Sequence, residues 1–497
     1  MKEYKNYIGG KWVDSRSNRT FESRNPSNWD EVIGIFPDSN EEDVQHAVEV
    51  AKEAQRKWAK VPAPKRGEIL RRAGEILLER KEEIARLMSR EIGKTLVEAR
   101  ADVQEAIDTA FYAAQETRRL FSYVTPSELP DKYALSLRVP VGIAGVITAW
   151  NFPIAVPSWK IFPALAAGNA VIFKPAPDGS ATGAELARVL EDAGLPPGVF
   201  NIVFGLGIAG RAIVEHPDIK IIAFTGGTET GKLIYQSAAK YVKKVSLELG
   251  GKNPQIVMPS AHLDLAVDGA LWGAFGTSGQ RCTSTSRLIL HEDIYDEFME
   301  KFRARLPELI IGDPLDEKTT MGPIINKPSL EKIERYVKLG IEEGARLTYG
   351  GKRLSEGKYA KGWWFEPTIF EDVKPHMKIF QDEIFGPVLS VIKVKSFDEA
   401  IEVANAVRYG LSSSIYTNDV REASLAMQLL EAGITYINAP TIGAESHLPF
   451  GGVKETGNGW REGGWTVFDI FTEWKTVYID YSGKLQKAQI DTWKDFE

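Results

Sequence analysis

Two side chains of the sequence suggest covalent chemistry, and the first is a cysteine. Cys282 is the only cysteine among 497 residues, and it lies among glycine, hydroxyl and arginine residues in SGQRCTSTSR (278–287). A thiol is strongly nucleophilic even when only a few per cent of it is ionised, and the neighbouring Arg281 favours the thiolate. The alternative is a cysteine that fills a small space in the core, as most free cysteines do.

The second side chain is Glu248, which lies between two leucines in SLELGGKNP (246–254). Burial on such a strand-like segment raises the pKa of a carboxyl group towards the range of a general base. An edge strand would instead leave this glutamate in water, and both interpretations are open at this point. A lone cysteine, a separate carboxylate and no suitably placed histidine together indicate a thioester route other than that of a Cys–His protease.

Glycine-rich turns suggest a nucleotide site. In FTGGTETGK (224–232), Gly226 and Gly227 end a strand, and Thr228 opens a helix. The free N–H groups of such a helix start can face a phosphate, although an ordinary capped helix would have the same sequence.

Two further stretches point to the same class of ligand. Lys174 ends the strand candidate in FKPAPD, so its ammonium group can reach hydroxyl or phosphate groups, or else extend over the surface into water. GLGIAG (205–210), with Gly207 at its centre, fits the dinucleotide fingerprint. It follows the third strand of the pattern, however, where glycines often form only a turn.

A parallel sheet is predicted to bring these residues together. Short apolar runs alternate with helix-like segments after Pro140, and a second α/β pattern covers residues 251–435. This alternation is typical of βαβ units, which bind ligands beyond the carboxyl ends of their strands. The five strands predicted for the first sheet are residues 141–150, 170–175, 201–204, 221–226 and 245–249.

Successive helices are predicted over residues 39–122. SNEE at Ser39–Glu42 fits a capping box ahead of apolar residues at helical spacing. After two prolines, a second helix is expected from Arg66 to about Ile92, and a third after Gly93.

Two segments alternate with a period of two residues, KYALSLRV (132–139) and KTVYIDYS (475–482). Unpaired strand edges of this kind usually find partners, so we interpret the segments as an oligomerisation ribbon. The alternative is a local hairpin within one subunit.

Composition excludes several functional classes. A net charge of -7 argues against nucleic-acid binding, which usually needs a basic patch. No apolar run is long enough for a signal peptide or a membrane helix, and a single cysteine forms no internal disulfide, so we expect a cytoplasmic protein. The six histidines lack metal-ligand spacing, and no metal site is predicted.

Six motifs in a fixed order resemble the aldehyde dehydrogenase superfamily, and the resemblance covers nearly the whole chain. It implies an α/β fold with a Rossmann-like parallel-sheet cofactor domain, a second α/β catalytic domain and a small β oligomerisation ribbon. The cofactor domain is expected to consist of residues 1–122 and 141–250, and the chain is expected to return to it at 436–472. The catalytic domain is expected at 251–435. The ribbon is expected at 123–140 and 473–497. The motifs are WNFP, FTGGTETG, LELGGKNP, GQRCT, EIFGPV (383–388) and PFGGVKETGNG (449–459).

The resemblance also implies catalytic roles. Cys282 matches the nucleophile that attacks the aldehyde, and Asn151 matches the amide that stabilises the oxyanion together with the Cys282 N–H. Hydride then passes to the nicotinamide and leaves a thioester, which Glu248 hydrolyses by activating water. Lys160, in SWKIFPALAAGN, matches a lysine associated with proton relay.

The cofactor implied is NAD or NADP. Lys174 matches the lysine that reaches the adenosine ribose, Glu383 matches the glutamate on the nicotinamide ribose, and Phe385 is expected nearby. Trp150 is expected to line the pyrophosphate path with the two glycines of FTGG.

Two departures from the family pattern leave the choice of coenzyme open. Many NAD-preferring members carry a glutamate where this chain has Pro177, followed by Asp178, so the repulsion of a 2′-phosphate is weakened. Gly227 also stands where serine is common.

The substrate expected from the resemblance is a carboxylated semialdehyde. The segment at 437–452 and the tail at 472–491 look most like the dehydrogenases of 2-oxoglutarate semialdehyde. Arg281 is the candidate residue for binding the substrate carboxylate, or else it forms a structural ion pair. Trp159 and Ser446-His447 are expected near the mouth of the substrate tunnel.

Other functions are considered beside this one. A broad-specificity aldehyde dehydrogenase, or one acting on succinic or aminoadipic semialdehyde, would share these motifs. A coenzyme A-acylating enzyme generally lacks the water-activating glutamate, and a catalytically silent structural protein would not need to keep the three catalytic residues. The expected partners are a small aldehyde and further copies of the chain, as a dimer or tetramer.

Overall fold

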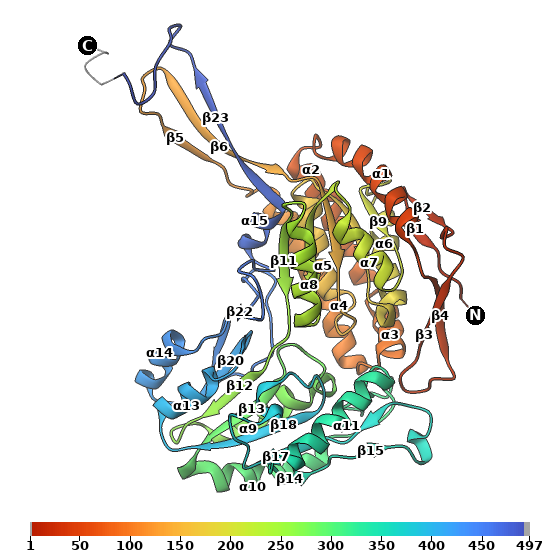
Figure 1. The fold of residues 1–497 in the computed structure, drawn as a ribbon, viewed down its shortest axis with the longest axis vertical. Coiled ribbons are helices and arrows are strands. Elements are labelled where there is room, and N and C mark those ends of the chain that lie inside the picture. The colour runs from red at the N-terminus through yellow and green to blue at the C-terminus, as the bar shows by residue number, and fades with distance from the viewer. Residues whose placement is uncertain (1, 492–497) are drawn as a thin grey trace.

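The computed structural model describes residues 2–491 and contains two seven-stranded sheets with a narrow arm beyond one of them (Figure 1). The α/β class with parallel sheets, expected from the sequence, is confirmed. Within residues 2–491, no helix has both the length and the apolar character that crossing a membrane requires.

The first sheet is built from the five predicted strands, all parallel, and a short N-terminal hairpin that adds two antiparallel strands. Each strand ends within a few residues of its predicted bound. In sheet order they are β11 (Lys244–Glu248), β10 (Ile219–Thr225), β7 (Ile143–Ile147), β8 (Ala170–Lys174), β9 (Phe200–Ile202), β1 (Asn6–Ile8) and β2 (Lys11–Val13).

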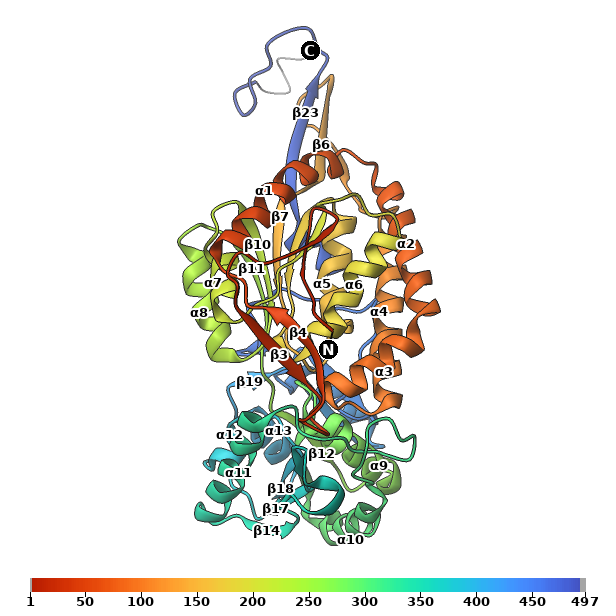
Figure 2. The same cartoon turned by 90° about the vertical axis from the view of Figure 1, so that its right-hand side faces the viewer.

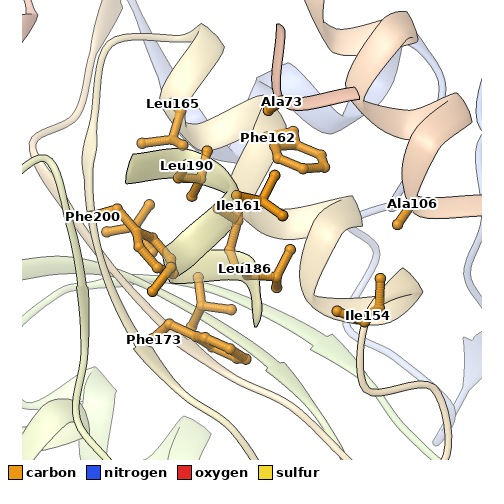
Figure 3. Packing of buried hydrophobic residues seen from close by; sticks show 14 of the residues in the cluster. Ala73, Ala106, Ile154, Ile161, Phe162, Leu165, Phe173, Leu186, Leu190 and Phe200 are labelled. Atoms are coloured by element: carbon orange, nitrogen blue, oxygen red, sulfur yellow. The ribbon is translucent and has the colours of Figure 1, made fainter. Parts of the chain in front are cut away.

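Helices cover both faces of this sheet (Figure 2). On β8, Val171 and Phe173 pack against α5 (Ala155–Ala166) and α6 (Ser180–Asp192), as Figure 3 shows for Phe173 with residues of both helices. Ala170 and Ile172 face the opposite cluster. Because both faces are buried, the strands are continuously apolar. The opposite face is covered by α1 (Glu41–Trp58), α7 (Gly207–Glu215) and α8 (Thr228–Ala239).

The capping box predicted at Ser39–Glu42 is wrong by one residue. Asn40 is the N-cap of α1: its side chain accepts the N–H groups of Glu42 and Asp43, and the Asp43 carboxylate accepts the Asn40 N–H. The Ser39 hydroxyl is already occupied, because it accepts a hydrogen bond of 2.8 Å from the Asn6 amide.

The second predicted helix is in fact two helices. α2 (Ala63–Glu79) and α3 (Lys81–Ile92) meet at Arg80, whose backbone leaves the helical conformation. α4 (Leu96–Glu116) follows after Gly93, which has a left-handed φ of 77° and ends α3. Any side chain here would meet two prolines, since a Cβ on Gly93 would lie 2.5 Å from Pro323.

The second sheet is parallel except for one edge strand. In sheet order it consists of β14 (Arg346–Tyr349), β17 (Thr368–Glu371), β18 (Val388–Val394), β13 (Thr285–His291), β12 (Asn253–Val257), β20 (Ser412–Tyr416) and β21 (Ile434–Ile437). Its helices are α9 (Leu263–Phe275), α10 (Tyr295–Arg305), α11 (Lys327–Glu342), α12 (Lys378–Gln381), α13 (Phe397–Asn405) and α14 (Val420–Leu429). The chain then returns to the first sheet, where α15 (Phe468–Phe471) packs against α5 and β11.

The arm is a three-stranded antiparallel sheet that extends away from the body (Figure 1). The two segments with period-two patterns pair with each other along their length, from Lys132 opposite Asp480 to Pro140 opposite Thr472. The two segments therefore pair within one chain, although they lie far apart in the sequence and form no local hairpin with each other. The use of the arm in oligomerisation stays a prediction, and the end of the predicted segment, 492–497, lies outside the described residues. The strands are β5 (Tyr123–Pro126), β6 (Lys132–Pro140) and β23 (Thr472–Asp480).

Three short antiparallel pairs complete the strands. They are β3 (Thr20–Arg24) with β4 (Val32–Pro37), β15 (Arg353–Leu354) with β16 (Trp364–Phe365), and β19 (Tyr409–Gly410) with β22 (Val453–Lys454).

A buried ion pair fixes the start of α5 against α4. Lys94 and Asp102 have no exposed side-chain surface, and their charged atoms are 2.7 Å apart. The second oxygen of Asp102 accepts the Ala155 N–H at 2.8 Å, and the Lys94 ammonium lies 3.4 Å from the centre of the Phe152 ring. This cluster holds the chain immediately after Asn151.

Replacing Asp102 by Asn should destabilise the protein strongly, because the Lys94 ammonium group would stay buried without its counter-ion. We expect the free energy of unfolding in urea to fall by about 3–5 kcal/mol. Glu82→Gln, which removes only exposed ion pairs to Arg86 and Arg100, is the matched control and should leave stability unchanged. Equal effects of the two substitutions would contradict this role.

Candidate active site

The parallel register places chemically useful side chains at one edge of the first sheet. Thr225 of β10 is opposite Glu248 of β11, and Ile147 of β7 is opposite Lys174 of β8. The carboxyl ends of four strands thus form one row, from which the following turns carry Asn151 and Gly226 towards the second sheet.

The cysteine approaches this edge on a strained loop. Thr277, Ser278 and Gly279 have φ values of 51°, 55° and 68°, and the left-handed conformation is unfavourable for the first two. Glu98 of α4 holds the loop, because its Oε1 accepts the Thr277 N–H at 2.6 Å. Asn253 at the start of β12 fixes the far end by donating to the Cys282 carbonyl at 2.8 Å.

Two adjacent glycines let the chain after β11 approach the segments of Cys282 and Glu383 closely. A Cβ on Gly251 would lie 2.3 Å from the Cys282 carbonyl oxygen, and one on Gly250 would lie 2.5 Å from Glu383 Oε2. The Gly251 N–H also donates to Glu383 Oε1 at 2.9 Å. The sequence LELGG therefore brings Glu248, Cys282 and Glu383 into one site.

Glu248 is buried, although β11 is an edge strand. The segment around Gly457 pairs with it, the side chain is 3% exposed, and neither carboxylate oxygen has a hydrogen-bond partner among the described residues. Gly451 leaves room for the carboxyl group, since a Cβ there would lie 2.5 Å from Oε1. The interpretation as a solvated edge glutamate is therefore wrong.

Burial sets the protonation of Glu248 and of the lysine beside it. Burial raises the pKa of Glu248 to about 8, although Lys160 and Arg461 favour the charged form. Burial lowers the pKa of Lys160 to about 7. Lys160 also forms a buried ion pair with Glu462. No hydrogen bond joins Lys160 to Glu248 among the described residues, and the electrostatic effect of each group on the other is smaller than that of burial.

Cys282 lies deep in the site, with partial exposure to a cavity. Burial raises the pKa of its thiol to about 12, and the charges of Glu383 and Glu248 act in the same direction. The N–H groups of Thr283 and of Cys282 itself oppose this effect. The prediction that Arg281 favours the thiolate finds no support, because that guanidinium turns away to Thr277 and Glu98.

Asn151 reaches across to the cysteine loop. Its Nδ2 donates to the Gln280 carbonyl oxygen at 3.1 Å, two residues before Cys282. Asn151 and Cys282 line one cavity of about 240 Å³, called the inner cavity here, together with Trp150, Gly226, Glu383 and Phe385. Trp150 and Phe385 meet edge to face, with ring centres 5.8 Å apart.

A second cavity of about 690 Å³, called the outer cavity, begins on the other side of the β10 end. Lys174 and Gly207 line it, so both sequence candidates lie there, whereas Gly226 lines the inner cavity. Lys174 is 6% exposed and does not extend into water. Its Nζ donates to the Pro175 carbonyl at 3.2 Å.

The two cavities together fit a dinucleotide. Between them, Gly227 precedes α8 with open space where a Cβ would be. The hydroxyls of Thr225 and Thr228 are buried there without a hydrogen-bond partner among the described residues. A helix start with unpaired hydroxyl groups suits a pyrophosphate.

Several residues of the site carry no recognisable sequence signal. Lys332 and Ser329 of α11 line the inner cavity, and Glu462 pairs with Lys160. Each lies in an ordinary helix or loop sequence, and only the packing of distant segments brings it to the site.

A third cavity, called the mouth cavity, has a volume of about 760 Å³. Arg281, Ser446 and His447 line it, and Phe152 lines both this and the inner cavity. Trp159 lines neither; it is buried against Phe450, with ring centres 4.7 Å apart.

The family follows from comparison with known proteins. The model of the aldehyde dehydrogenase family matches residues 12–477. The chain belongs to the aldehyde dehydrogenase family. The alpha-ketoglutaric semialdehyde dehydrogenase of Bacillus subtilis (strain 168) is 42% identical over 477 residues, which cover 96% of this chain and 98% of that protein. The alpha-ketoglutarate semialdehyde dehydrogenase of Haloferax volcanii is 42% identical over 480 residues, covering 96% and 99%.

Solved structures agree with this assignment. The 3,6-anhydro-L-galactose dehydrogenase in complex with NADP superposes with a TM-score of 0.93 at 37% identity, covering 96% of this chain and all of that chain. This protein is therefore an NAD(P)-dependent aldehyde dehydrogenase, and its expected class of enzyme is confirmed.

Alkylation of this aldehyde dehydrogenase by iodoacetamide should depend steeply on pH. Because the thiol pKa is raised to about 12, only a small thiolate fraction exists at pH 7. The rate constant for the free enzyme should rise about tenfold per pH unit from roughly pH 7 to pH 10. Mass spectrometry would report one adduct per chain, since Cys282 is the only cysteine.

Glutathione, alkylated in parallel, should level off near its own pKa of roughly 8.5–9 and serves as the reference. If the rate constant of the protein levelled off at a lower pH than that of glutathione, the thiol pKa would be lowered, and the prediction would be contradicted.

Proposed function

We propose that this enzyme oxidises 2-oxoglutarate semialdehyde to 2-oxoglutarate, with Cys282 as nucleophile. The observation that carries the substrate is Arg281, which lines the mouth cavity directly beside the nucleophile in the chain. Its Nε donates to Thr277 at 2.8 Å and its Nη2 to Glu98 at 3.2 Å, while Nη1 donates to no described residue. The names of the two relatives that are 42% identical support the same substrate.

A guanidinium with free donors matches a carboxylate in charge and shape. Arg281 is held in place by stacking, with its charge 5.0 Å from the Trp272 ring and 5.4 Å from the Phe152 ring. Since Phe152 also lines the inner cavity, an aldehyde held by its carboxylate in the mouth cavity points its carbonyl towards Cys282. The ion pair with Glu98 thus orients Arg281 as well as stabilising the loop.

Glu105 favours an oxo acid over an amino acid. This carboxyl group lines the mouth cavity, and burial together with the Asp102 charge raises its pKa to about 8. At neutral pH it is therefore mostly protonated and can donate a hydrogen bond to a 2-oxo group. Above pH 8 it is negatively charged and suits an ammonium group, which makes aminoadipic semialdehyde the second candidate.

The chemistry begins when the Cys282 sulfur bonds to the aldehyde carbon. The oxygen gains negative charge, and Asn151 Nδ2 and the Cys282 N–H donate to it; one such donor typically changes the rate by about 10²–10³. The thiol proton leaves to the carboxylate form of Glu248, whose oxygens have no other partner among the described residues, and Lys160 takes this proton before Glu248 acts on water. When bound, the nicotinamide of the cofactor supplies the acceptor for the two electrons and the hydrogen that leave this carbon.

Glu248 then acts on the resulting thioester of Cys282. Its carboxylate removes a proton from water, the hydroxide adds to the acyl carbon, and the carbon–sulfur bond breaks to give the free acid and the thiol. Lys160, with Glu462 behind it, can take the proton from Glu248 because its own pKa is near 7. A free-acid product requires this water-activating base, which argues against coenzyme A as the acceptor.

The rest of the site would hold the cofactor. The nicotinamide end would be lined by Trp150, Glu383 and Phe385, and the Glu383 carboxylate would accept hydrogen bonds from the ribose hydroxyls. Gly226, Gly227 and Thr228 would face the pyrophosphate, and Lys174 and Gly207 would lie at the adenosine end.

We also assign the first sheet to cofactor binding, the second to catalysis and the arm to assembly as a homodimer or homotetramer. The arm exposes Tyr123, Trp474 and Tyr478, which supports its use as an interface between copies. A single free thiol with catalytic use supports a reducing, cytoplasmic location.

The substrate proposal predicts a preference of at least about 10² in kcat/KM for 2-oxoglutarate and succinic semialdehydes over propionaldehyde, the scale of one charge-assisted contact. Arg281→Leu should remove this preference and leave kcat/KM for propionaldehyde within about threefold of the wild type. Steady-state kinetics with the three aldehydes measures both.

Glu98→Gln is the matched control, since it weakens the ion pair but keeps the guanidinium. It should retain the preference. An equal loss of activity towards all three aldehydes in Arg281→Leu would show a structural role only, and a flat wild-type profile would exclude the carboxylated substrate.

A further inference from the structure

Three successive carbonyl groups, beginning with that of Cys282, accept hydrogen bonds from buried side chains. The Asn253 amide donates to the Cys282 and Ser284 carbonyl oxygens, at 2.8 Å in both cases. The Thr441 hydroxyl donates to the Thr283 carbonyl oxygen at 2.7 Å. The backbone that carries the thiol is therefore held by side chains from two other segments of the chain.

Asn253 is itself fixed by its surroundings. The side chain is 2% exposed, and its Oδ1 accepts the Ser412 N–H at 3.1 Å. Gly251 leaves room for it, because a Cβ there would lie 3.0 Å from Asn253 Oδ1. The register of β12 against β13 shifts between Asn253 and Pro254, and a proline has no N–H to donate. The asparagine side chain thus supplies donors at a point where the strand backbone has none.

Cys282 and Thr283 are the two central residues of a turn. The Ser284 N–H closes this turn by donating to the Arg281 carbonyl at 3.1 Å. The central peptide unit of such a turn takes no part in the closing bond, and the common turn types differ by a rotation of this unit. The bond from Asn253 to the Cys282 carbonyl holds the unit at its carbonyl end.

The direction of this carbonyl also sets the direction of the Thr283 N–H. In a planar trans peptide, the C=O and N–H groups point to opposite sides. Because the carbonyl points to Asn253, the N–H points away from it and faces the Cys282 thiol, where it favours the charged form. No carbonyl or side-chain oxygen among the described residues accepts the Thr283 N–H.

We propose that Asn253 is a positioning residue for the nucleophile, because its bond to the Cys282 carbonyl keeps the Thr283 N–H directed at the sulfur. A hydrogen bond to a charged acceptor is stronger than one to a neutral acceptor, so this N–H increases the fraction of reactive thiolate. The inference rests on Cys282 as the proposed nucleophile and not on the identity of the aldehyde.

Alkylation of the full chain by iodoacetamide tests this role without aldehyde or coenzyme. Asn253→Leu keeps the size and branching of the side chain and removes both donors. The rate constant should fall about tenfold at each pH from roughly 7 to 10, the scale of one hydrogen bond to a charged group. Mass spectrometry reports the adduct on Cys282.

Gln255→Met is the matched control. Gln255 is a buried amide of the same strand, and it donates to the Ala266 carbonyl of α9 at 2.8 Å instead of to the nucleophile segment. Its loss should lower the melting temperature and leave the alkylation rate within about twofold of the wild type. An equal fall in the alkylation rate of both variants would show a general loosening and overturn the assignment.

Asn253→Ser keeps the test decisive if Asn253→Leu does not fold. Its shorter hydroxyl can donate to only one carbonyl, so its rate constant should be at least about threefold below that of the wild type. Calorimetric affinities for NAD and NADP should change by less than about twofold, since Asn253 lines neither the inner nor the outer cavity. Wild-type alkylation rates in either folded Asn253 variant would overturn the proposal.

Cys282→Ala tests the underlying nucleophile separately. It should abolish NAD(P)H production, whereas the alkylation rates of the Asn253 variants are measured without turnover. Activity that survived in Cys282→Ala would contradict the proposed function and leave the measured effect of Asn253 on the thiol unchanged.

Discussion

A carboxyl group buried without a hydrogen-bond donor is the constraint on which the rest of the site depends. Glu248 is 3% exposed and both its oxygens lack partners among the described residues, a state that is costly for the charged form. The protein accommodates it by neutralising it: burial raises the pKa of Glu248 to about 8. The same burial raises the pKa of Cys282 and lowers that of Lys160. Burial therefore favours the neutral forms of Glu248 and Cys282, whereas Lys160 has an acidic partner in Glu462.

Close backbone packing maintains this dry environment. Gly250, Gly251 and Gly451 each stand where a Cβ would meet Glu383, the Cys282 carbonyl or Glu248. Strain at Thr277 and Ser278 is balanced by Glu98, which accepts three hydrogen bonds at the loop and links it to α4. The proposed nucleophile, base and oxyanion donor therefore come from separate segments whose geometry is set by the two sheets.

The sequence predicts the first sheet well because its strands are continuously apolar and are separated by helices. The apolar runs and the turns between them therefore indicate the same strand positions. It also selects Cys282, Glu248 and Asn151, each from a short motif with characteristic neighbours, and their catalytic roles stay predictions. The break at Arg80 escapes prediction, because no proline or glycine marks it. The N-cap at Asn40 escapes because the choice between adjacent Ser39 and Asn40 depends on Asn6, which is distant in sequence.

The same limit applies to charge. Arg281 is adjacent to Cys282 in the chain, yet its side chain points to Glu98, and the Asp178 carboxylate turns from the expected ribose site to Asn326. Lys332 and Glu462 reach the site only through packing of distant segments. Sequence proximity fixes which groups are available, whereas side-chain direction is set by tertiary contacts.

The most direct test of the account is a stopped-flow measurement with Glu248→Gln, which keeps the size of the side chain and removes the base. If Glu248 hydrolyses the thioester, the variant should release a burst of about one NAD(P)H per active site and then turn over at least about 10² times more slowly than the wild type. Intact mass spectrometry after the burst should show the acyl group on Cys282. Turnover at the wild-type rate, with no acylated protein, would contradict the central claim.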